Sequence, residues 1–310
     1  MQGLVVRNTG SWYEVRTDCG RLVACKVKGH FRLRGIRSTN PVAVGDRVEV
    51  SENADGTAYI HEIHERRNYI IRRASNLSKQ SHILAANVDQ VLLMVTVNHP
   101  VTSLVFVDRF LASAEAYRVP VVLLFNKMDL FSPAERERVG ALQDLYQGIG
   151  YECLAISVKD GEGMATLPTM LSDKVSLVAG NSGVGKSALI NKLIPGADVR
   201  TAPISDAHNA GMHTTTFSSL YDLPSGGSLI DVPGVRGFGT FNFERTEVSH
   251  YFREIFAASQ ECRFSDCLHL EEPGCAVRQA LEEGRIAASR YQSYLSMLDD
   301  KDEDRYRQAY

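Results

Sequence analysis

Apolar and polar residues alternate in short runs through residues 1–66, with Gly, Asp and Asn at the breaks. Runs of this kind indicate strands that bury one face and expose the other. They predict strands at residues 3–8, 12–17, 21–28, 47–52 and 58–63. Five short strands with turn residues between them favour a small β-barrel of the oligonucleotide-binding (OB-fold) type, although an SH3-like barrel would give much the same pattern.

A different pattern begins after residues 67–80, a stretch with few apolar residues that we interpret as a linker. Residues 88–97 are almost continuously apolar, as expected of a strand buried on both faces. A helix at 103–117, a strand at 119–125, a helix ending near residue 148 and strands at 151–156 and 174–179 follow. Ser132, Pro133 and Glu135 supply a capping box for the second helix. This alternation predicts a doubly wound α/β domain with a mostly parallel sheet.

The last third of the chain changes pattern again. Further strands are predicted at 217–223 and 228–230, and helices at 245–258 and 276–298. The highly charged residues 299–310 are expected to fray. We therefore predict a multidomain chain with a barrel at residues 1–70, the α/β domain at 71–240 and a helical domain at 241–310.

The composition, with 44% hydrophobic and 23% charged residues, is that of an ordinary globular protein. The longest apolar runs, such as residues 91–95, are far too short to span a bilayer. The first residues lack the basic segment and apolar core of a secretory signal. We therefore expect a cytoplasmic protein that does not contact a membrane.

Positive charge is concentrated near the N-terminus. The net charge of the chain is −3, but residues 1–73 carry 13 Lys and Arg against 8 Asp and Glu, a local net charge of +5. The candidate RNA-binding residues fall within twelve positions that contain no acid: Lys26, Lys28, Phe31, Arg32, Arg34 and Arg37. Such a patch on a barrel indicates an anionic partner such as RNA. Phe31 can either stack on a base or pack under its own loop.

Residues 180–187 match the phosphate-binding pattern G-x-x-x-x-G-K-[ST] at every fixed position, between an apolar run and a helical pattern. The backbone N–H groups of such a loop face a polyphosphate. Lys186 can reach the β- and γ-phosphates, and Ser187 can hold Mg²⁺. The predicted contacts are Gly180, Asn181, Ser182, Gly183, Val184, Gly185, Lys186, Ser187 and Ala188.

Two motifs that follow predicted strands favour guanine. Asn126, Lys127 and Asp129 form an N-K-x-D motif. The carboxylate of Asp129 can accept from two N–H groups of guanine that adenine lacks, Asn126 can hold the other edge of the ring, and the Lys127 stem can lie against the nucleotide. Ser157 and Lys159 follow the next strand, where a backbone N–H can reach the guanine carbonyl.

Two further motifs fit the γ-phosphate. Asp231 and Gly234 form D-x-x-G, in which the aspartate orients Mg²⁺ through its water shell and the glycine N–H meets the γ-phosphate. Thr214 or Thr215 can complete the Mg²⁺ shell, and we favour Thr215. The guanine motifs precede the phosphate loop, so the order is that of a circularly permuted GTPase. A doubly wound sheet tolerates this order because all the motifs lie at one edge.

The C-terminal segment carries a complete set of metal ligands. Cys262, Cys267, His269 and Cys275 supply three thiolates and one imidazole, the ligands of a closed tetrahedral zinc site. We predict one structural Zn²⁺ per chain that stabilises the small helical domain. Reduced, buried cysteines are the alternative.

The barrel pattern, the permuted motif order and the Cys-x₄-Cys-x-His-x₅-Cys module together resemble the RsgA (YjeQ/YloQ) family over the whole chain. The resemblance implies a monomeric GTPase that binds the small ribosomal subunit and its rRNA during late maturation, is stimulated by the subunit, and leaves after GTP has been hydrolysed to GDP. It also implies a catalytic role for His213, beside Lys186, because Val235 occupies the position where many GTPases have a glutamine. Met212 departs from the basic or polar residue that most members have before that histidine.

Two other classes of protein remain open from the sequence. A P-loop kinase acting on a small molecule would bind nucleotide and Mg²⁺, but it would need neither the guanine motif nor the barrel. A nucleotide-gated RNA-binding module would have all these parts and negligible turnover. Turnover of GTP compared with ATP, with and without small subunits, distinguishes the three.

Overall fold

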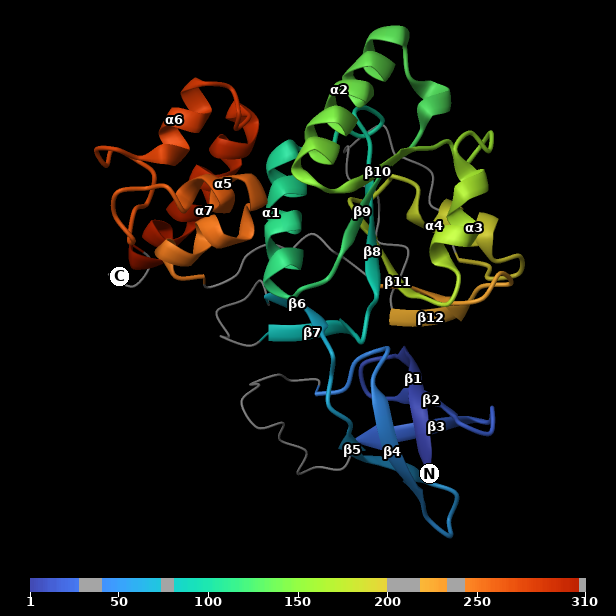
Figure 1. Ribbon diagram of the computed structural model, residues 1–310. Helices are drawn as coiled ribbons and strands as arrows, with labels where there is room; N and C mark the ends of the chain where they lie inside the picture. Colours follow the sequence, from blue (N-terminus) through green and yellow to red (C-terminus); the bar gives the residue numbers. More distant parts are fainter. Residues whose placement is uncertain (28–40, 74–80, 200–217, 233–242, 307–310) are drawn as a thin grey trace.

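The computed structural model describes residues 1–27, 41–73, 81–199, 218–232 and 243–306 (Figure 1). Several predicted site residues therefore lie outside the described residues: Lys28, Phe31, Arg32, Arg34, Arg37, His213, Thr214, Thr215 and Gly234.

The N-terminal strands form a closed barrel. They are β1 (Gln2–Asn8), β2 (Tyr13–Thr17), β3 (Leu22–Val27), β4 (Arg47–Glu52) and β5 (Ala58–Ile63). Their order is β1-β2-β3-β5-β4, and an antiparallel pairing of β1 with β4 closes the ring. The closed order and the parallel pairing of β3 with β5 confirm the OB-fold prediction. Alternate residues such as Val15, Cys25 and Ile60 point inward and are fully buried.

The central sheet confirms the doubly wound prediction. It contains β8 (Gln90–Val95), β9 (Val121–Phe125), β10 (Glu152–Ala155), β11 (Val175–Gly180), β12 (Ser218–Asp222) and β13 (Ser228–Asp231). The order is β10-β9-β8-β11-β13-β12, and only β12 is antiparallel to its neighbour.

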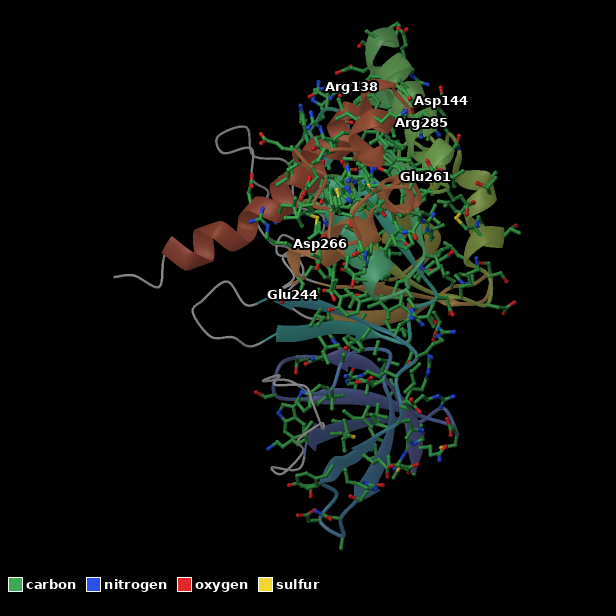
Figure 2. All side chains as sticks on the ribbon, turned by 60° about the vertical axis from the view of Figure 1, so that its left-hand side comes forward. Arg138, Asp144, Glu244, Glu261, Asp266 and Arg285 are labelled. Carbon is green, nitrogen blue, oxygen red and sulfur yellow. The ribbon has the colours of Figure 1, made fainter. Side chains whose placement is uncertain are left out.

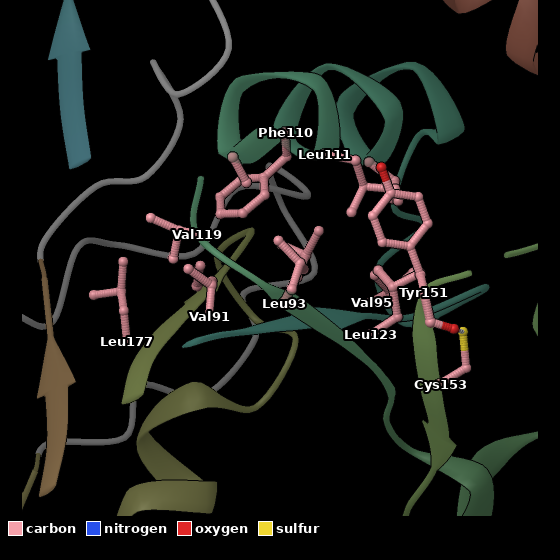
Figure 3. Close-up of a cluster of buried hydrophobic side chains, with 14 of the residues drawn as sticks. Val91, Leu93, Val95, Phe110, Leu111, Val119, Leu123, Tyr151, Cys153 and Leu177 are labelled. Atoms are coloured by element: carbon pink, nitrogen blue, oxygen red, sulfur yellow. Dashed lines mark hydrogen bonds between the residues drawn. The ribbon is translucent and has the colours of Figure 1, made fainter. Parts of the chain in front are cut away.

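Helices cover both faces of this sheet. The helices are α1 (Leu104–Ala116) and α2 (Pro133–Ile149) on one face, and α3 (Leu167–Leu171) and α4 (Lys186–Leu193) on the other. Leu93 of β8 packs toward Phe110 and Leu111 of α1 (Figure 3), whereas its neighbour Leu92 belongs to the core beneath α3 and α4. The predicted capping box begins α2, since Ser132 Oγ accepts from the Glu135 N–H.

The segment that we interpreted as a linker is instead partly a hairpin, and that prediction is wrong. Strands β6 (Tyr69–Arg73) and β7 (Ser81–Ala86) pair antiparallel, and Ala85 forms a bridge with Val44 of the barrel. Among the described side chains of the hairpin, Ile70, Ile83, Ala85 and Ala86 are buried, and the two apolar runs are separated in the sequence by polar residues. The predicted boundary at residue 70 falls inside β6.

The barrel and the central sheet are also hydrogen-bonded to each other. Strand β1 pairs antiparallel with β12, with Arg7 opposite Ser219 and Asn8 opposite Ser218. The result is one 11-stranded sheet that runs from the α/β domain into the barrel (Figure 1). The sequence contained no signal for this pairing.

The C-terminal domain is helical as predicted, with different bounds. It contains the 3-10 helix η4 (Arg245–Tyr251), α5 (Arg253–Ser259), α6 (Ala276–Glu282) and α7 (Ala288–Tyr306). Each predicted helix is broken in two, the second where Gly284 adopts a left-handed φ of 73°. The backbone of α7 continues to Tyr306, so the fraying expected from residue 299 is wrong up to that point.

This domain packs against α1 of the α/β domain. Its core includes Phe252, Val277 and Tyr294, and Ala112 of α1 is buried in the same cluster. Charged side chains such as Glu261, Asp266 and Arg285 lie on its outer surface (Figure 2). Among the described helices, none is both long and apolar enough to cross a membrane.

Candidate functional site

The predicted nucleotide motifs meet at one edge of the central sheet. Asn126 follows β9, Ser157 comes shortly after β10, Gly180 ends β11 and Asp231 ends β13. Because these four strands are parallel, their carboxyl ends lie on the same side of the sheet. The order of the strands places the guanine motifs on β9 and β10 and the phosphate motifs on β11 and β13, with β8 between them.

The phosphate loop has a backbone that only glycine can adopt at its two closest approaches. Gly180 has a φ of 139°, and a Cβ there would lie 2.5 Å from the carbonyl oxygen of Met94. Gly185 has a φ of 108°, and its Cβ would lie 2.4 Å from Nδ2 of Asn126. The ammonium of Lys186 donates to the carbonyl oxygens of Gly180 and Asn181, at 2.9 and 2.8 Å, and so stays at the mouth of the loop. Helix α4 starts at Lys186, so its N-terminal N–H groups face the same space.

Asn126 connects the phosphate loop to both guanine motifs. Its Nδ2 donates to the carbonyl oxygen of Val184 at 2.7 Å, and its Oδ1 accepts from the N–H of Val158 at 3.2 Å. The residue is 2% exposed. Both polar ends of the side chain are therefore engaged inside the protein. The expected contact with the edge of the base would compete with these two hydrogen bonds.

Asp129 is held in place by the second guanine motif. Its Oδ1 accepts from the hydroxyl of Ser157 at 2.8 Å, and its Oδ2 lies 3.7 Å from Nζ of Lys159. The side chain of Asp129 is 7% exposed, whereas that of Lys159 is 75% exposed. A carboxylate fixed in this way can accept two parallel N–H groups, as guanine presents them, without first losing rotamer freedom.

Two contacts that the sequence did not reveal support the loop that carries Lys127 and Asp129. Lys127 adopts a left-handed φ of 73°, and its ammonium donates to the carbonyl oxygen of His99, in the loop after β8. Burial lowers the pKa of Lys127, and the charge of Asp129 partly offsets the effect. Arg136 of α2 donates to the carbonyl oxygen of Met128 at 2.7 Å. No sequence pattern marks Arg136 as a contact of this loop, because it lies in the exposed first turn of α2 among other charged residues.

Asp231 lies beside the phosphate loop, as the D-x-x-G motif requires. It is 1% exposed and pairs with Val178 of β11 in parallel register. The rest of that motif and the threonine run are outside the described residues. The structure thus brings together the phosphate loop, Asn126, Asp129 and Asp231.

The four predicted metal ligands converge on one point. The ligand atoms of Cys262, Cys267, His269 and Cys275 all lie within 4.8 Å of one another. Nδ1 of His269 lies 3.6 Å from Sγ of Cys262 and 3.5 Å from Sγ of Cys275, and these two sulfurs are 4.0 Å apart. A tetrahedral zinc site with bonds of about 2.0–2.3 Å has edges of roughly 3.4–3.8 Å, so the donor set fits a zinc ion. The sulfurs are far too distant for a disulfide.

Hydrogen bonds from neighbouring side chains hold the backbone around these ligands. The carboxylate of Glu272 accepts the N–H groups of Leu268 and Leu270, both at 2.8 Å, on either side of His269. Tyr291 donates its hydroxyl to the carbonyl oxygen of His269 at 2.5 Å. Burial raises the pKa of Cys267 to about 12 and lowers that of His269. A bound cation would offset the energetic cost of burying the thiolate, which is the form of cysteine that binds metal.

Of the candidate RNA-binding residues, only Lys26 lies within the described part of the chain. It is exposed on β3, and its ammonium lies 4.5 Å from the ring centre of Trp12. Trp12 was not among the predicted contacts, although a tryptophan close to a basic segment in the sequence is a signal that could have indicated it.

Comparison with family models gives two matches that together span the first two domains. The RsgA N-terminal domain model matches residues 2–60, and the RsgA GTPase model matches residues 63–241. Among curated proteins, the small ribosomal subunit biogenesis GTPase RsgA of Bacteroides fragilis (strain YCH46) is 61% identical over 310 residues, covering 100% of both chains. The protein of the same name from Porphyromonas gingivalis (strain ATCC 33277) is 58% identical over 315 residues, again covering 100% of each.

Two solved structures have similar folds. YjeQ from Thermotoga maritima superposes with a TM-score of 0.76 and 35% sequence identity, covering 96% of this chain and 97% of the other. YloQ, described as a circularly permuted GTPase, superposes with a TM-score of 0.72 and 30% identity, covering 97% and 95%. Both similarities extend over the barrel, the α/β domain and the C-terminal helices, because so little of either chain is left uncovered.

Proposed function

Because the chain belongs to the RsgA GTPase family, we propose that it hydrolyses GTP in the maturation of the small ribosomal subunit, the process for which its relatives are named. The observation that carries the proposal is the side chain of Asn126. By bonding both the phosphate loop and the segment that holds Asp129, it makes one rigid site from a phosphate-binding part and a guanine-binding part. A site of this construction favours a guanine nucleotide over an adenine nucleotide.

The nucleotide is bound by residues at the sheet edge. Asp129 accepts the two N–H groups of guanine, with Lys127 against the nucleotide and with Ser157 and Lys159 holding the carboxylate. The phosphate loop wraps the β- and γ-phosphates, to which Lys186 supplies charge. The remaining GTP contacts are those predicted above for the loop, the threonine run and the D-x-x-G motif, with Asp231 beside the loop.

Mg²⁺ enters with GTP. Ser187 and Thr215 would hold it, and it would neutralise charge that develops between the β- and γ-phosphates. The buried carboxylate of Asp231 would act through the water shell of the ion. We assign the alignment of the attacking water to His213, because Val235 has no polar group for that task.

The flanking domains are proposed to make the contacts with the ribosome. We propose three functional units, at residues 1–70, 71–240 and 241–310, in which the barrel binds rRNA through Lys26, Lys28, Phe31, Arg32, Arg34 and Arg37. In this scheme the GTP form binds the subunit, the subunit stimulates hydrolysis, and the GDP form leaves. The zinc site has a structural role, since all four positions of a tetrahedron would be taken by the protein.

Turnover measurements test the proposal against the two alternatives. GTP and ATP hydrolysis by the full chain are compared with and without purified small ribosomal subunits, with Lys186→Ala as the inactive control. We expect GTP turnover that rises several-fold or more with subunits, and negligible ATP turnover. Preferential use of ATP would indicate a kinase-like protein. Binding of GTP to the subunit complex without turnover would indicate a nucleotide-gated RNA-binding module.

A further inference from the structure

Three side chains form a row across the outer face of the barrel. Strands β2 and β3 pair Tyr13 with Cys25, which places Trp12 opposite Lys26 at the next position. The ammonium of Lys26 lies over the Trp12 ring, 4.5 Å from its centre. Strands β3 and β5 pair Lys26 with Tyr59 in parallel register. Trp12 just before β2, Lys26 on β3 and Tyr59 on β5, here called the outer row, therefore lie side by side.

The outer row faces away from the barrel core. Each member has a neighbour in sequence that is buried inside the barrel, namely Tyr13, Cys25 and Ile60. Trp12 remains 46% exposed, which is unusual for so large an apolar side chain.

The position of Trp12 is also fixed by its backbone. The N–H and the hydroxyl of Thr9 both donate to the carbonyl oxygen of Trp12, at 2.9 and 3.1 Å. The ring is thus presented by a defined turn between β1 and β2, and it needs little further ordering to bind a flat partner.

The charges around the row favour an anionic partner. Glu14, on the same face, lies 3.9 Å from the guanidinium of Arg7, which offsets its charge. Within the described part of the chain, no carboxylate forms an ion pair with Lys26. In sequence, Lys26 also opens the basic segment at residues 26–37. A cation over one aromatic ring, with a second aromatic residue beside it on the next strand, offers one contact to a phosphate and two surfaces to bases.

We propose that the outer row is a stacking site for unpaired bases of RNA. Bases stack on Trp12 and Tyr59, and Lys26 contacts the phosphate between them. A base paired inside a duplex exposes only its edges in a groove, so the interior of a duplex cannot use these ring faces. The inference deepens the RNA contact proposed for the barrel and rests on it, since it specifies single-stranded RNA and names two residues beyond the basic segment.

Trp12 is the only tryptophan of the chain, so its fluorescence reports on the outer row alone. The full chain, loaded with a non-hydrolysable GTP analogue, is titrated with a single-stranded oligouridylate of about ten nucleotides, a length in the range of OB-fold sites. A duplex RNA of the same length is the comparison. We expect the single strand to quench Trp12 and the duplex to leave it unchanged at the same salt concentration.

Variants separate stacking from charge. Binding of a fluorescently labelled oligouridylate should weaken about tenfold in Trp12→Ala and in Tyr59→Ala, because each removes one stacked base. Lys26→Met should reduce the number of counterions released on binding by about one, as measured from the slope of log affinity against log salt concentration. Leu22→Ala is the matched control. Leu22 is 61% exposed on the same strand and face, four residues from Lys26, and its loss should leave affinity unchanged.

The outcomes are distinct from those of the proposed function. Equal quenching by the duplex, or full affinity in both aromatic variants, would overturn the stacking site even if small subunits still stimulate GTP turnover. Quenching by intact subunits but not by their deproteinised RNA would place a protein on the outer row and would also overturn it. Absence of stimulation in the wild-type chain would instead count against the proposed function, whatever Trp12 reports.

Discussion

The guanidinium of Arg290 donates to Oδ1 of Asp108 at 2.8 Å, although 182 positions separate the two residues in the chain. Their side chains are 1% and 0% exposed. Arg290 also donates to Glu254 at 2.6 Å, and Tyr146 and Ser293 donate their hydroxyl groups to the carboxylate of Asp108. This buried network joins α7 and α5 of the C-terminal domain to α1 and α2 of the α/β domain.

Arg290 keeps its charge despite burial. Burial by itself lowers the pKa of Arg290, but the hydrogen bonds with Glu254 and Asp108 and the charges of both raise it above its ordinary value. Arg290 also lies over the ring of Phe252, 4.7 Å from its centre. The C-terminal domain is therefore attached to α1 by a satisfied set of charged groups as well as by apolar packing.

Removing the arginine should destabilise the protein strongly. Arg290→Met leaves two buried or half-buried carboxylates without their cation, which typically costs about 3–5 kcal/mol. Denaturant unfolding of the full chain measures the loss. Arg285→Met is the control, because Arg285 pairs with Glu283 at the surface and its removal should change stability by less than about 1 kcal/mol. Equal stability of the two variants would mean that the buried network does not attach the domain.

Sequence patterns predicted the elements whose signal is local. The strand before the phosphate loop, the capping box at Ser132 and the apolar run of β8 all follow from neighbouring residues, and the structure confirms them. The motifs could be placed at one edge because parallel strands end together. Gly284 carried a signal that was missed, since a glycine within a helical pattern commonly marks the end of a helix.

The remaining features depend on partners that are distant in sequence. The apolar residues of the β6–β7 hairpin are separated in the sequence by a polar stretch, and they pack against Ala43 and Val44 of the barrel segment and against the core of the α/β domain. The pairing of Arg7 with Ser219 is an edge contact between two sheets, which no periodicity encodes. Both ends of Asn126 are engaged by residues distant in sequence, Val184 and Val158, and the motif alone does not say which of its atoms face the protein.

Guanine specificity should depend on Asp129. In Asp129→Asn the two N–H groups of guanine lose their acceptor pair, at a cost of about 1–3 kcal/mol for each unpaired buried group. We expect weaker GDP binding by titration calorimetry and gained binding of xanthosine nucleotides, whose ring carries an acceptor where guanine has a donor. Asp144→Asn, on the exposed surface of α2 (Figure 2), should bind GDP normally. Undiminished GDP affinity in Asp129→Asn would contradict the assignment.

The metal content should follow the thiol cluster. Protein purified without added zinc is expected to contain about one equivalent of zinc, and the Cys267→Ser, Cys275→Ser double variant should lose it. Cys19→Ser, an exposed cysteine of the barrel, should retain it. Elemental analysis of the three proteins decides the matter. A full equivalent in the double variant would place the metal elsewhere.

Subunit-stimulated hydrolysis should depend on His213, which lies outside the described residues. Hydrolysis needs a water aligned with the γ-phosphate. If binding of the subunit favours the state in which His213 meets that water, turnover should be slow alone and fast on the subunit. We expect His213→Ala to bind GTP and small subunits normally but to lose most of the stimulated rate, while His250→Ala, on the C-terminal domain, keeps it. Retained stimulation with weakened subunit binding would make His213 an anchor instead.

Asn126 can either connect the phosphate loop to the guanine motif inside the protein or contact the base, and the two roles predict different results. Asn126→Ala leaves the carbonyl of Val184 and the N–H of Val158 without partners, so affinity should fall for GDP and GTP alike by about 1–3 kcal/mol for each group. If Asn126 only bonds to the protein, its side chain makes no hydrogen bond to the base. In that case 7-deaza-GDP, which lacks the N7 acceptor, should bind the wild-type chain as tightly as GDP does.

The matched control is Asn191→Ala. Asn191 forms the same two kinds of bond, with the N–H and carbonyl of Val199 at 2.9 and 2.8 Å, away from the guanine motifs. Both variants should therefore lose stability, but only Asn126→Ala should lose nucleotide affinity out of proportion to it. If wild-type affinity drops with 7-deaza-GDP and Asn126→Ala no longer distinguishes it from GDP, the side chain contacts the base. The hydrogen bonds with Val184 and Val158 would then give way when nucleotide binds.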